Sequence, residues 1–426
     1  MVARDKLLTY NRCAFAQGQN NGVVTVGSVP VAVVGVQRWR SDEAASPSYT
    51  VISIMRIAQI SPLYESVPPS GYGGTERVVS WLTEELVCAG HDVTLFASGD
   101  STTTARLVAM CPSALRTDPT CIDPLAHHLL MVEEVRKRRD EFDMVHFHID
   151  YLHFSQSRQS EIKQVTTLHG RLDLPDLVAI YQEFREMPVI SVSRAQRKPL
   201  PQINWVGNVY HGLPKDLFSC CPEPGKYLAF IGRISPEKRP DRAIEIATAA
   251  GIPLKIAAKI DRVDRVYFEE KIKPLMQSPW VEFIGEIGDH EKNEFLGNAL
   301  ACLFPIDWPE PFGLVMIEAM SCGTPTIAFR NGSVPEIIED GVSGFIVDSV
   351  ESAVKAVERV GFIDRQACRA AFESRFTSQR MAHDYLRIYN QMRGHREQSS
   401  GGPELVRSGV GKVNSYPKEP KRRWKT

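Results

Sequence analysis

The segment EPFGLVMIEAMSCGTP, residues 310–325, carries the clearest structural signal in this chain. Its two carboxylates, Glu310 and Glu318, are separated by a proline, a glycine and the start of an apolar run. Proline is tolerated in the first turn of a helix, and Gly323 after the run is a natural stop. The pattern therefore predicts a helix over residues 312–322.

The start of this helix predicts an anion site. The first amides of a helix have no partner within it and carry a partial positive charge, so phosphate groups often bind there. Glu318 lies about 7.5 Å along the axis from Gly313, at about 1.5 Å of rise per residue, which matches the separation of a phosphate and a ribose. The same residues also fit an ordinary amphipathic helix with acidic residues near its start, and the segment alone does not distinguish the two.

Composition predicts a soluble protein of two domains. The chain has 426 residues, which is long for one hydrophobic core, and it is 43% hydrophobic and 24% charged with a net charge of −1. The balanced charge argues against nucleic acid as a partner, and no apolar run reaches the length of about 18 residues that a membrane-spanning helix needs. The nine cysteines include no C-x-x-C pair, which predicts reduced thiols in the cytoplasm and disfavours zinc.

Both ends of the chain differ from the rest in composition. Residues 1–54 are predicted to be a disordered leader, or a segment translated from upstream of the natural start, because their valine-rich run is interrupted by Gly, Ser and Pro. Residues 394–426 are polar and basic and are predicted to be a disordered tail. The folded part is therefore expected between these two ends.

The first convincing unit after the leader is a strand, a glycine-rich loop and a helix. The apolar segment 55–61 predicts the strand, and a helix predicted at 75–89 follows Gly73 and Gly74. Glycines here allow close backbone approach and positive φ. The unit predicts a second anion site, although a tight turn without a ligand has the same pattern, and its spacing is not the G-x-G-x-x-G of nicotinamide cofactor sites.

Strands and helices then alternate through the first half of the chain. Segments rich in Val and Ile recur between amphipathic segments, which predicts a parallel sheet covered on both faces. Ligands bind at the carboxyl ends of strands in such sheets, and His169 stands at such an end in TTLHG. His146 and His148 alternate along another strand, where the lack of a third ligand at suitable spacing favours packing over a metal site.

The second half repeats this architecture after a turn-rich linker at residues 212–227. Arg233 ends the first strand of this half, and Lys238 stands shortly after it, where a helix begins. Cations at a strand-to-helix turn fit a diphosphate, since arginine offers a planar fork of donors and lysine a compact charge. Two solvated surface cations are the alternative. Helices predicted at 350–360 and 378–392 close the fold.

Several segments, taken in order, resemble the retaining glycosyltransferases of family 4: GYGGTERVV (71–79), TTLHG (166–170), FIGRISPEKRP (230–240), EPFGLVMIEAMSCGTPTIAF (310–329) and NGSVPEIIEDGVSGFIV (331–347). The resemblance covers residues 55–392 and leaves both ends outside. It implies the α/β GT-B fold, in which two Rossmann-like domains with parallel sheets face a central cleft. It implies an N-terminal acceptor-side domain at 55–213 and a C-terminal nucleotide-sugar domain at 214–375. A closing helix at 376–393 is expected to pack back on the first domain.

The resemblance implies a set of catalytic side chains. Arg233 and Lys238 are expected to hold the diphosphate of the donor and to neutralise the leaving phosphate. His169 is expected to bond the transferred sugar at its 6-position, and Glu310 to accept other hydroxyls of that sugar. Glu318 is expected to accept the hydroxyls of the ribose.

Backbone groups complete the implied donor site. The amides of Phe312, Gly313 and Leu314 are expected to contact the same diphosphate. Gly73 and Gly74 are expected to approach the phosphate and the acceptor, in front of the helix that Glu76 begins.

The resemblance also implies the partners of a reaction. The donor is a nucleotide diphosphate sugar, with UDP-glucose favoured and GDP-mannose next, and the acceptor is a sugar, lipid or small molecule in glycan or exopolysaccharide synthesis. No cofactor and no metal are expected, because arginine and lysine supply the charge and no D-x-D motif stands in the expected place. Asp261 and Asp264 are interpreted as solvent-facing helix carboxylates. The protein is expected in the cytoplasm, with peripheral membrane contact but no transmembrane segment.

Small departures from the family pattern and two alternatives accompany this interpretation. Arg239 stands where many members have Gly after the Lys, and Gly170 where some have Asp after the His. Neither departure removes a charge proposed for the donor site, but glycine at position 170 leaves the contacts to the acceptor undefined. A sugar-nucleotide 2-epimerase of the same fold and a non-catalytic nucleotide-sugar binding protein are the alternative functions.

Overall fold

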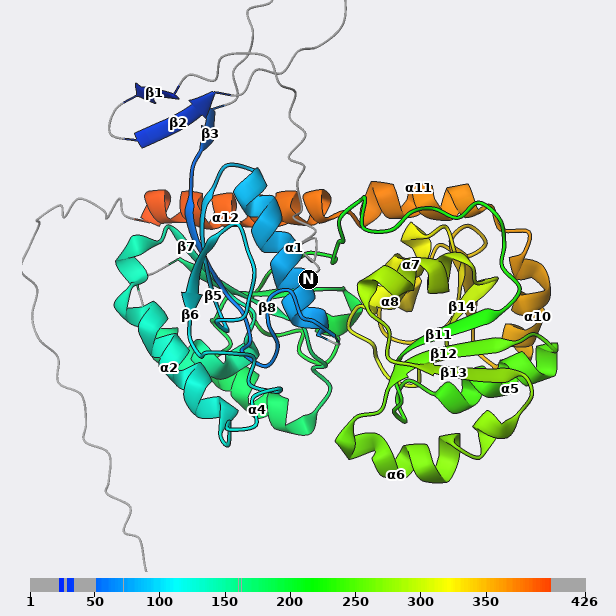
Figure 1. The fold of residues 1–426 in the computed structure, drawn as a ribbon. Helices are drawn as coiled ribbons and strands as arrows, with labels where there is room; N and C mark the ends of the chain where they lie inside the picture. Colours follow the sequence, from blue (N-terminus) through cyan, green and yellow to red (C-terminus); the bar gives the residue numbers. More distant parts are fainter. Residues whose placement is uncertain are drawn as a thin grey trace, which may run out of the picture.

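Two parallel sheets, each built from one half of the chain, form the body of the molecule (Figure 1). This arrangement confirms the predicted α/β class with two Rossmann-like halves. The computed structural model describes residues 23–26, 29–33, 51–71, 73–159, 161 and 163–399.

The first sheet has seven parallel strands in the order β10-β9-β8-β7-β4-β5-β6. Its central strands are buried along their whole length, as expected when helices cover both faces of a parallel sheet. The strands are β4 (Arg56–Ile60), β5 (Asp92–Ala97), β6 (Arg106–Ala109), β7 (Met144–Phe147), β8 (Gln164–Leu168), β9 (Val189–Ser191) and β10 (Trp205–Asn208).

The helices of the first half begin and end where local sequence favours it. Helix α1 was predicted at 75–89 and ends before Gly90, whose φ of 86° suits glycine. Helix α2 begins with a proline after Asp123, whose carboxylate accepts the Leu125 amide at 3.0 Å. The helices are α1 (Gly74–Cys88), α2 (Pro124–Lys137), α3 (Phe154–Ser157) and α4 (Pro175–Glu183).

The second sheet has six parallel strands in the order β13-β12-β11-β14-β15-β16. Its strands are β11 (Leu228–Arg233), β12 (Leu254–Lys259), β13 (Val281–Gly285), β14 (Ala301–Phe304), β15 (Thr326–Phe329) and β16 (Gly344–Val347). Its helices are α5 (Pro240–Ala250), α6 (Arg265–Tyr267), α7 (Asp289–Gly297), α8 (Leu314–Ser321), α9 (Val334–Ile337), α10 (Val350–Val360) and α11 (Arg365–Arg375).

The last helix, α12 (Ser378–Ser399), follows α11 and runs along the first half of the molecule (Figure 1). It packs against α1. The Ser378 hydroxyl donates to Glu85 at 2.6 Å, and the Tyr389 hydroxyl lies 2.7 Å from Nδ1 of His146. The end of the chain's second half is thereby attached to the core of the first.

The structure differs from the prediction at both ends. Three strands, β1 (Val23–Val26), β2 (Val29–Val33) and β3 (Val51–Ser53), form a separate antiparallel sheet, so a wholly disordered leader is wrong for these residues. Their valine runs have the high strand propensity of β-branched residues. Residues 394–399 belong to α12 rather than to a disordered tail, and the rest of both segments lies outside the described residues.

Some elements inside the fold were not predicted. Strand β6 is short and lies at a sheet edge. Helix α11 has a narrow buried apolar stripe, Cys368, Ala371 and Phe372, in an otherwise polar sequence, so it is hard to recognise as a core helix. Among the described residues, no helix combines the length and the apolar character that crossing a membrane requires.

Candidate functional site

A cleft of about 670 Å³ lies between the two halves. It is lined by the carboxyl ends of strands and the starts of helices from both sheets, which is where ligands bind in open α/β folds. Every residue that the sequence singled out as a site residue lines it: Gly73, Gly74, His169, Arg233, Lys238, Glu310, Phe312, Gly313, Leu314 and Glu318.

Helix α8 begins at Leu314, slightly later than predicted, because Gly313 caps it in the left-handed region with φ of 80°. A Cβ at this position would lie 2.7 Å from Cε of Met316 and 3.0 Å from Cζ of Phe304, so only glycine fits. The start of α8 lines the cleft and therefore places its unpaired amides and positive dipole end there.

The start of α1 meets the start of α8 across the cleft. A Cβ added to Gly74 would lie 3.7 Å from Cδ1 of Leu314, so the two helix starts lie close together. At Gly73 a Cβ would lie 2.8 Å from Cβ of Pro69, so the loop before α1 has no room for a side chain. Two helix N-termini thus converge on one space, which favours an anion between them.

Lys238 is held at the cleft by a carboxylate and two aromatic rings. Its Nζ donates to Oε2 of Glu310, and the side chains of the pair are 18% and 10% exposed. The same Nζ lies 5.0 Å from the ring centroid of Trp308 and 5.7 Å from that of Phe304, in cation–π geometry. Lys238 and Glu310, far apart in sequence, therefore form one polar unit in the cleft wall.

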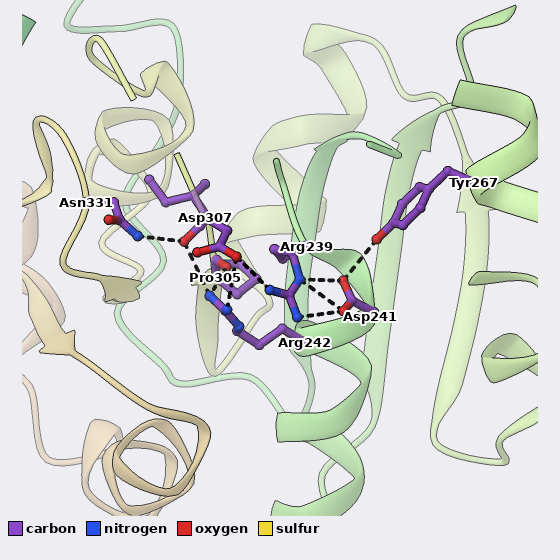
Figure 2. A network of polar contacts seen from close by, with 8 residues as sticks. Arg239, Asp241, Arg242, Tyr267, Pro305, Asp307 and Asn331 are labelled. Carbon is purple, nitrogen blue, oxygen red and sulfur yellow. Dashed lines mark hydrogen bonds and ion pairs between the residues drawn. The ribbon is translucent and has the colours of Figure 1, made fainter. Parts of the chain in front are cut away.

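Arg239, the residue after Lys238, belongs to a network of polar contacts (Figure 2). Its φ of 55° lies in the left-handed region, which glycine adopts more easily than arginine. The Arg239 guanidinium bonds Asp241 at 3.0 Å and Asp307 at 2.8 Å, and Asp241 also accepts from Tyr267 at 3.0 Å. Helix α5 is thereby joined to the loop that leads to Glu310.

A second part of the network supports the same loop. Arg242 donates to the carbonyl of Pro305 at 3.0 Å, and Asn331 donates to the carbonyl of Ile306 at 3.0 Å (Figure 2). Because buried carbonyls need partners, these bonds hold the segment after β14 in one conformation.

Arg233 lies at the end of β11 among three carboxylates. It donates to Glu237 and forms ion pairs with Asp264 at 3.3 Å and Asp261 at 3.7 Å. The interpretation of Asp261 and Asp264 as solvent-facing carboxylates is wrong, because their side chains are only 26% and 12% exposed and face Arg233. Burial raises the pKa of Asp264, against the opposing effect of the Arg233 charge.

His169 lies at the end of β8 and is supported from behind by His148. Nε2 of His169 is 2.9 Å from Nδ1 of His148, whose Nε2 is 2.8 Å from Oε1 of Gln59. Because the Gln59 oxygen only accepts, His148 donates to it and must accept from His169, which leaves Nδ1 of His169 as an acceptor. Burial lowers the pKa of His169 to about 3, so the ring is neutral at physiological pH.

His146 and His148 are both buried, and each of their ring nitrogens has a hydrogen-bond partner. Nδ1 of His146 lies 2.7 Å from the Tyr389 hydroxyl and its Nε2 lies 2.7 Å from the Thr167 hydroxyl, so both ring nitrogens have partners. In the described part of the chain, no three His, Cys, Asp or Glu side chains are grouped as metal ligands would be.

Two cleft residues were missed in the sequence. Lys292 of α7 bonds Oε1 of Glu318 at 2.8 Å, and Asp150, just after β7, lines the cleft with a left-handed φ of 49°. Burial raises the pKa of Asp150 to about 6. The position of Asp150 after a buried strand was a usable signal, whereas Lys292 stands in an ordinary polar helix pattern.

Glu76 in the first turn of α1 gives a testable pH dependence of stability. Burial, with the nearby Glu65 charge, raises its pKa from 4.5 to about 7, against the weaker effect of Arg116. The stability it contributes is complete below pH 4.5 and is lost as the pH rises through 7. Glu76→Gln is therefore expected to raise the unfolding free energy at pH 8 by about 2–3 kcal/mol and to change it little at pH 4.5. Urea titrations at both pH values measure this, and an equal change at both would contradict it.

Profiles of two sequence families match separate parts of the chain. The one described as "Glycosyltransferase Family 4" matches residues 72–206. The one described as "Glycosyl transferases group 1" matches residues 221–365. Each match covers most of one sheet and the helices around it, and together they include all the residues singled out above.

Curated relatives match over shorter stretches. An uncharacterized 41.2 kDa protein in the cps region of Klebsiella pneumoniae is 31% identical over 171 residues, which are 38% of this chain and 45% of the relative. D-inositol 3-phosphate glycosyltransferase of Mycobacterium leprae (strain Br4923) is 34% identical over 139 residues, 30% of each chain. The chain thus spans less than half the length of these relatives.

Solved structures match over nearly their whole length. Sucrose-phosphate synthase from Thermosynechococcus elongatus has a TM-score of 0.65 at 20% identity, covering 80% of this chain and 99% of its own. Anabaena Alr3699/HepE in complex with UDP-glucose has a TM-score of 0.58 at 18% identity, covering 81% and 100%. These likenesses establish the GT-B fold. The two profiles match the two halves in order, and on both matches together the chain belongs to the glycosyltransferases of group 1 and family 4.

Proposed function

We propose that this protein is a retaining glycosyltransferase that moves a hexose from a nucleotide diphosphate sugar to a hydroxyl of a sugar, lipid or small-molecule acceptor. The observation that carries the proposal is the convergence of two helix N-termini, Arg233 and Lys238 on one cleft that Glu310 and Glu318 also line. Positive groups suit a diphosphate, and the carboxylates suit the hydroxyls on either side of it.

Each cleft residue has a role in this proposal. Arg233 and Lys238 hold the diphosphate, together with the amides at the start of α8. Glu318 accepts the ribose hydroxyls, and Glu310 accepts hydroxyls of the transferred sugar. His169 accepts a hydrogen bond from the 6-hydroxyl of that sugar through Nδ1, which the His148 contact leaves as its acceptor atom.

The proposed mechanism is mainly electrostatic. As the bond between the sugar and the phosphate breaks, negative charge grows on the diphosphate and positive charge on the sugar ring. In this proposal, Arg233, Lys238 and the two helix N-termini, which all line the cleft, stabilise that negative charge, and preorganised charges of this kind lower the barrier most. The acceptor attacks from the side of the departing phosphate, and attack from this side preserves the anomeric configuration. The departing phosphate takes the acceptor's proton.

UDP-glucose is the favoured donor, with GDP-mannose next, and the reaction is proposed to need no metal because the two cations supply the charge. A neighbour of the same fold has been solved with UDP-glucose, which supports this order without deciding it. The acceptor is left as a sugar, lipid or small molecule of glycan or exopolysaccharide synthesis. A cytoplasmic location, with peripheral membrane contact, is part of the proposal, and the eight described cysteines are free thiols, as is usual in that compartment.

A panel of nucleotide sugars tests the proposal. A donor present at about 100 times its Kd is expected to stabilise the protein by about 2.7 kcal/mol, seen as a rise in Tm in thermal-shift measurements. With that donor and an acceptor mixture, proton NMR of the product should show the anomeric configuration of the donor. Conversion of the donor to an epimer without any acceptor would instead identify an epimerase, and binding without turnover would identify a non-catalytic binding protein.

A further inference from the structure

A chain of four charged side chains crosses the cleft from one half to the other. Arg77 of α1 donates to Oδ2 of Asp289 and to the carbonyl of Gly71 at 2.8 Å. Oδ1 of the same aspartate lies 3.4 Å from Nζ of Lys292, which bonds Oε1 of Glu318 at 2.8 Å. Positive and negative charges therefore alternate along this series of four side chains, and each carboxylate contacts a cation.

These side chains are too buried to be an ordinary surface ion pair. The side chains of Glu318, Arg77, Lys292 and Asp289 are 6%, 10%, 14% and 28% exposed. Buried charges are costly unless they are paired, and the cost holds a pair in one geometry. Arg77, Lys292 and Glu318 also line the cleft itself. The orientation of the Glu318 carboxylate is therefore set largely by Lys292.

We propose that Lys292 is a positioning residue for the nucleotide ribose. It holds one oxygen of Glu318, so that the remaining lone pairs of this carboxylate accept the ribose 2′ and 3′ hydroxyls in a fixed direction. Asp289 holds Lys292 in turn, and Arg77 ties Asp289 to the first half, so ribose recognition is coupled to the contact between the two halves. This inference rests on the proposed function and adds a residue to it.

The test separates the ribose hydroxyls from the rest of the nucleotide. Calorimetric titrations measure the affinity of the wild type and of Lys292→Met for UDP and for 2′,3′-dideoxyuridine 5′-diphosphate. GDP and ADP are each compared with their own 2′,3′-dideoxy forms in the same way. The wild type is expected to prefer the hydroxylated nucleotide by about 10- to 100-fold, as for hydrogen bonds to a charged group. Lys292→Met is expected to lose about 10-fold of this preference, while affinity for the dideoxy nucleotide changes less than about 3-fold.

Kinetics and neighbouring variants add independent readouts. Lys292→Met is expected to raise the KM for the donor with kcat nearly unchanged, because it weakens binding of a part that does not react. Lys292→Arg should restore part of the affinity, and Asp289→Asn should cause a smaller loss of the same kind. Lys255→Met is the matched control, since Lys255 pairs with Glu282 at 3.3 Å outside the cleft. Should Lys292→Met not fold, Asp289→Asn carries the comparison.

Three results would overturn the inference. If Lys292→Met kept the full preference for hydroxylated nucleotides, or lost affinity equally for both forms, Lys292 would not act through the ribose, whatever the protein's reaction. If the wild type bound none of the nucleotides, the proposed function would fail and this inference with it. Loss of the preference in Lys292→Met but not in Lys255→Met supports it.

Discussion

Lys238→Ala is expected to lower kcat by about 10²–10³-fold, or about 3–4 kcal/mol in the barrier, which is what the loss of one preorganised donor to a developing oxyanion costs. The ammonium group is the compact charge proposed to hold the leaving phosphate, and its removal also leaves the buried Glu310 without its cation. The unpaired carboxylate would then repel the diphosphate and increase the loss.

Single-turnover measurements with the identified donor check this expectation, because they separate chemistry from product release. Lys255→Ala serves as the control, since it removes a lysine of the same half that does not line the cleft. Circular dichroism and thermal unfolding establish that both variants are folded. A kcat for Lys238→Ala within a few-fold of the wild type would sink the proposed role.

Arg233→Met is expected to lower kcat/KM by a similar factor of about 10²–10³. The guanidinium is held in place by Glu237, Asp261 and Asp264, and these carboxylates would be left facing each other and the diphosphate. Arg233→Lys keeps the charge but loses the planar fork, so it should recover only part of the activity.

The control for Arg233 is Arg330→Met. Arg330 is 52% exposed and pairs at 3.1 Å with Asp348, which is 70% exposed, so its loss should change stability and activity little. Titration of Arg233→Met with the nucleoside diphosphate measures how much of the loss in kcat/KM comes from weaker binding. An Arg233→Met variant with near-normal kcat/KM would remove Arg233 from the mechanism.

The predicted elements agree with the structure wherever the sequence pattern is local and strong. Helix α10 was predicted at the residues it occupies, and α1 within one residue at each end, because a clear hydrophobic period and terminal residues such as Gly90 act over short distances. Strand β6 was missed because it is a short edge strand, and helix α11 because its apolar stripe is narrow and the rest of its sequence is polar. Strands β1 to β3 were missed because the glycines and proline in the valine run were weighted above its strand propensity.

The candidate site shows the same division. Its residues could be named because several segments together resemble one family, whereas each motif alone also fits an amphipathic helix, a tight turn or surface cations. The partners of those residues could not be read in this way. Glu310 with Lys238, Lys292 with Glu318, and Asp264 with Arg233 join segments far apart in the sequence, and the error about Asp264 arose from judging a carboxylate by its local pattern alone.

The sequence by itself determined the succession of strands and helices, and with it the parallel sheets whose carboxyl ends form a site, because these depend on local propensity and periodicity. Tertiary structure alone decided which charges meet, how far each is buried and which tautomer His169 adopts. The physical reason is that pairing and burial depend on distance in space, and the packing of α12 on the first half, the approach of α1 to α8 and the Arg77 contact to Asp289 set those distances.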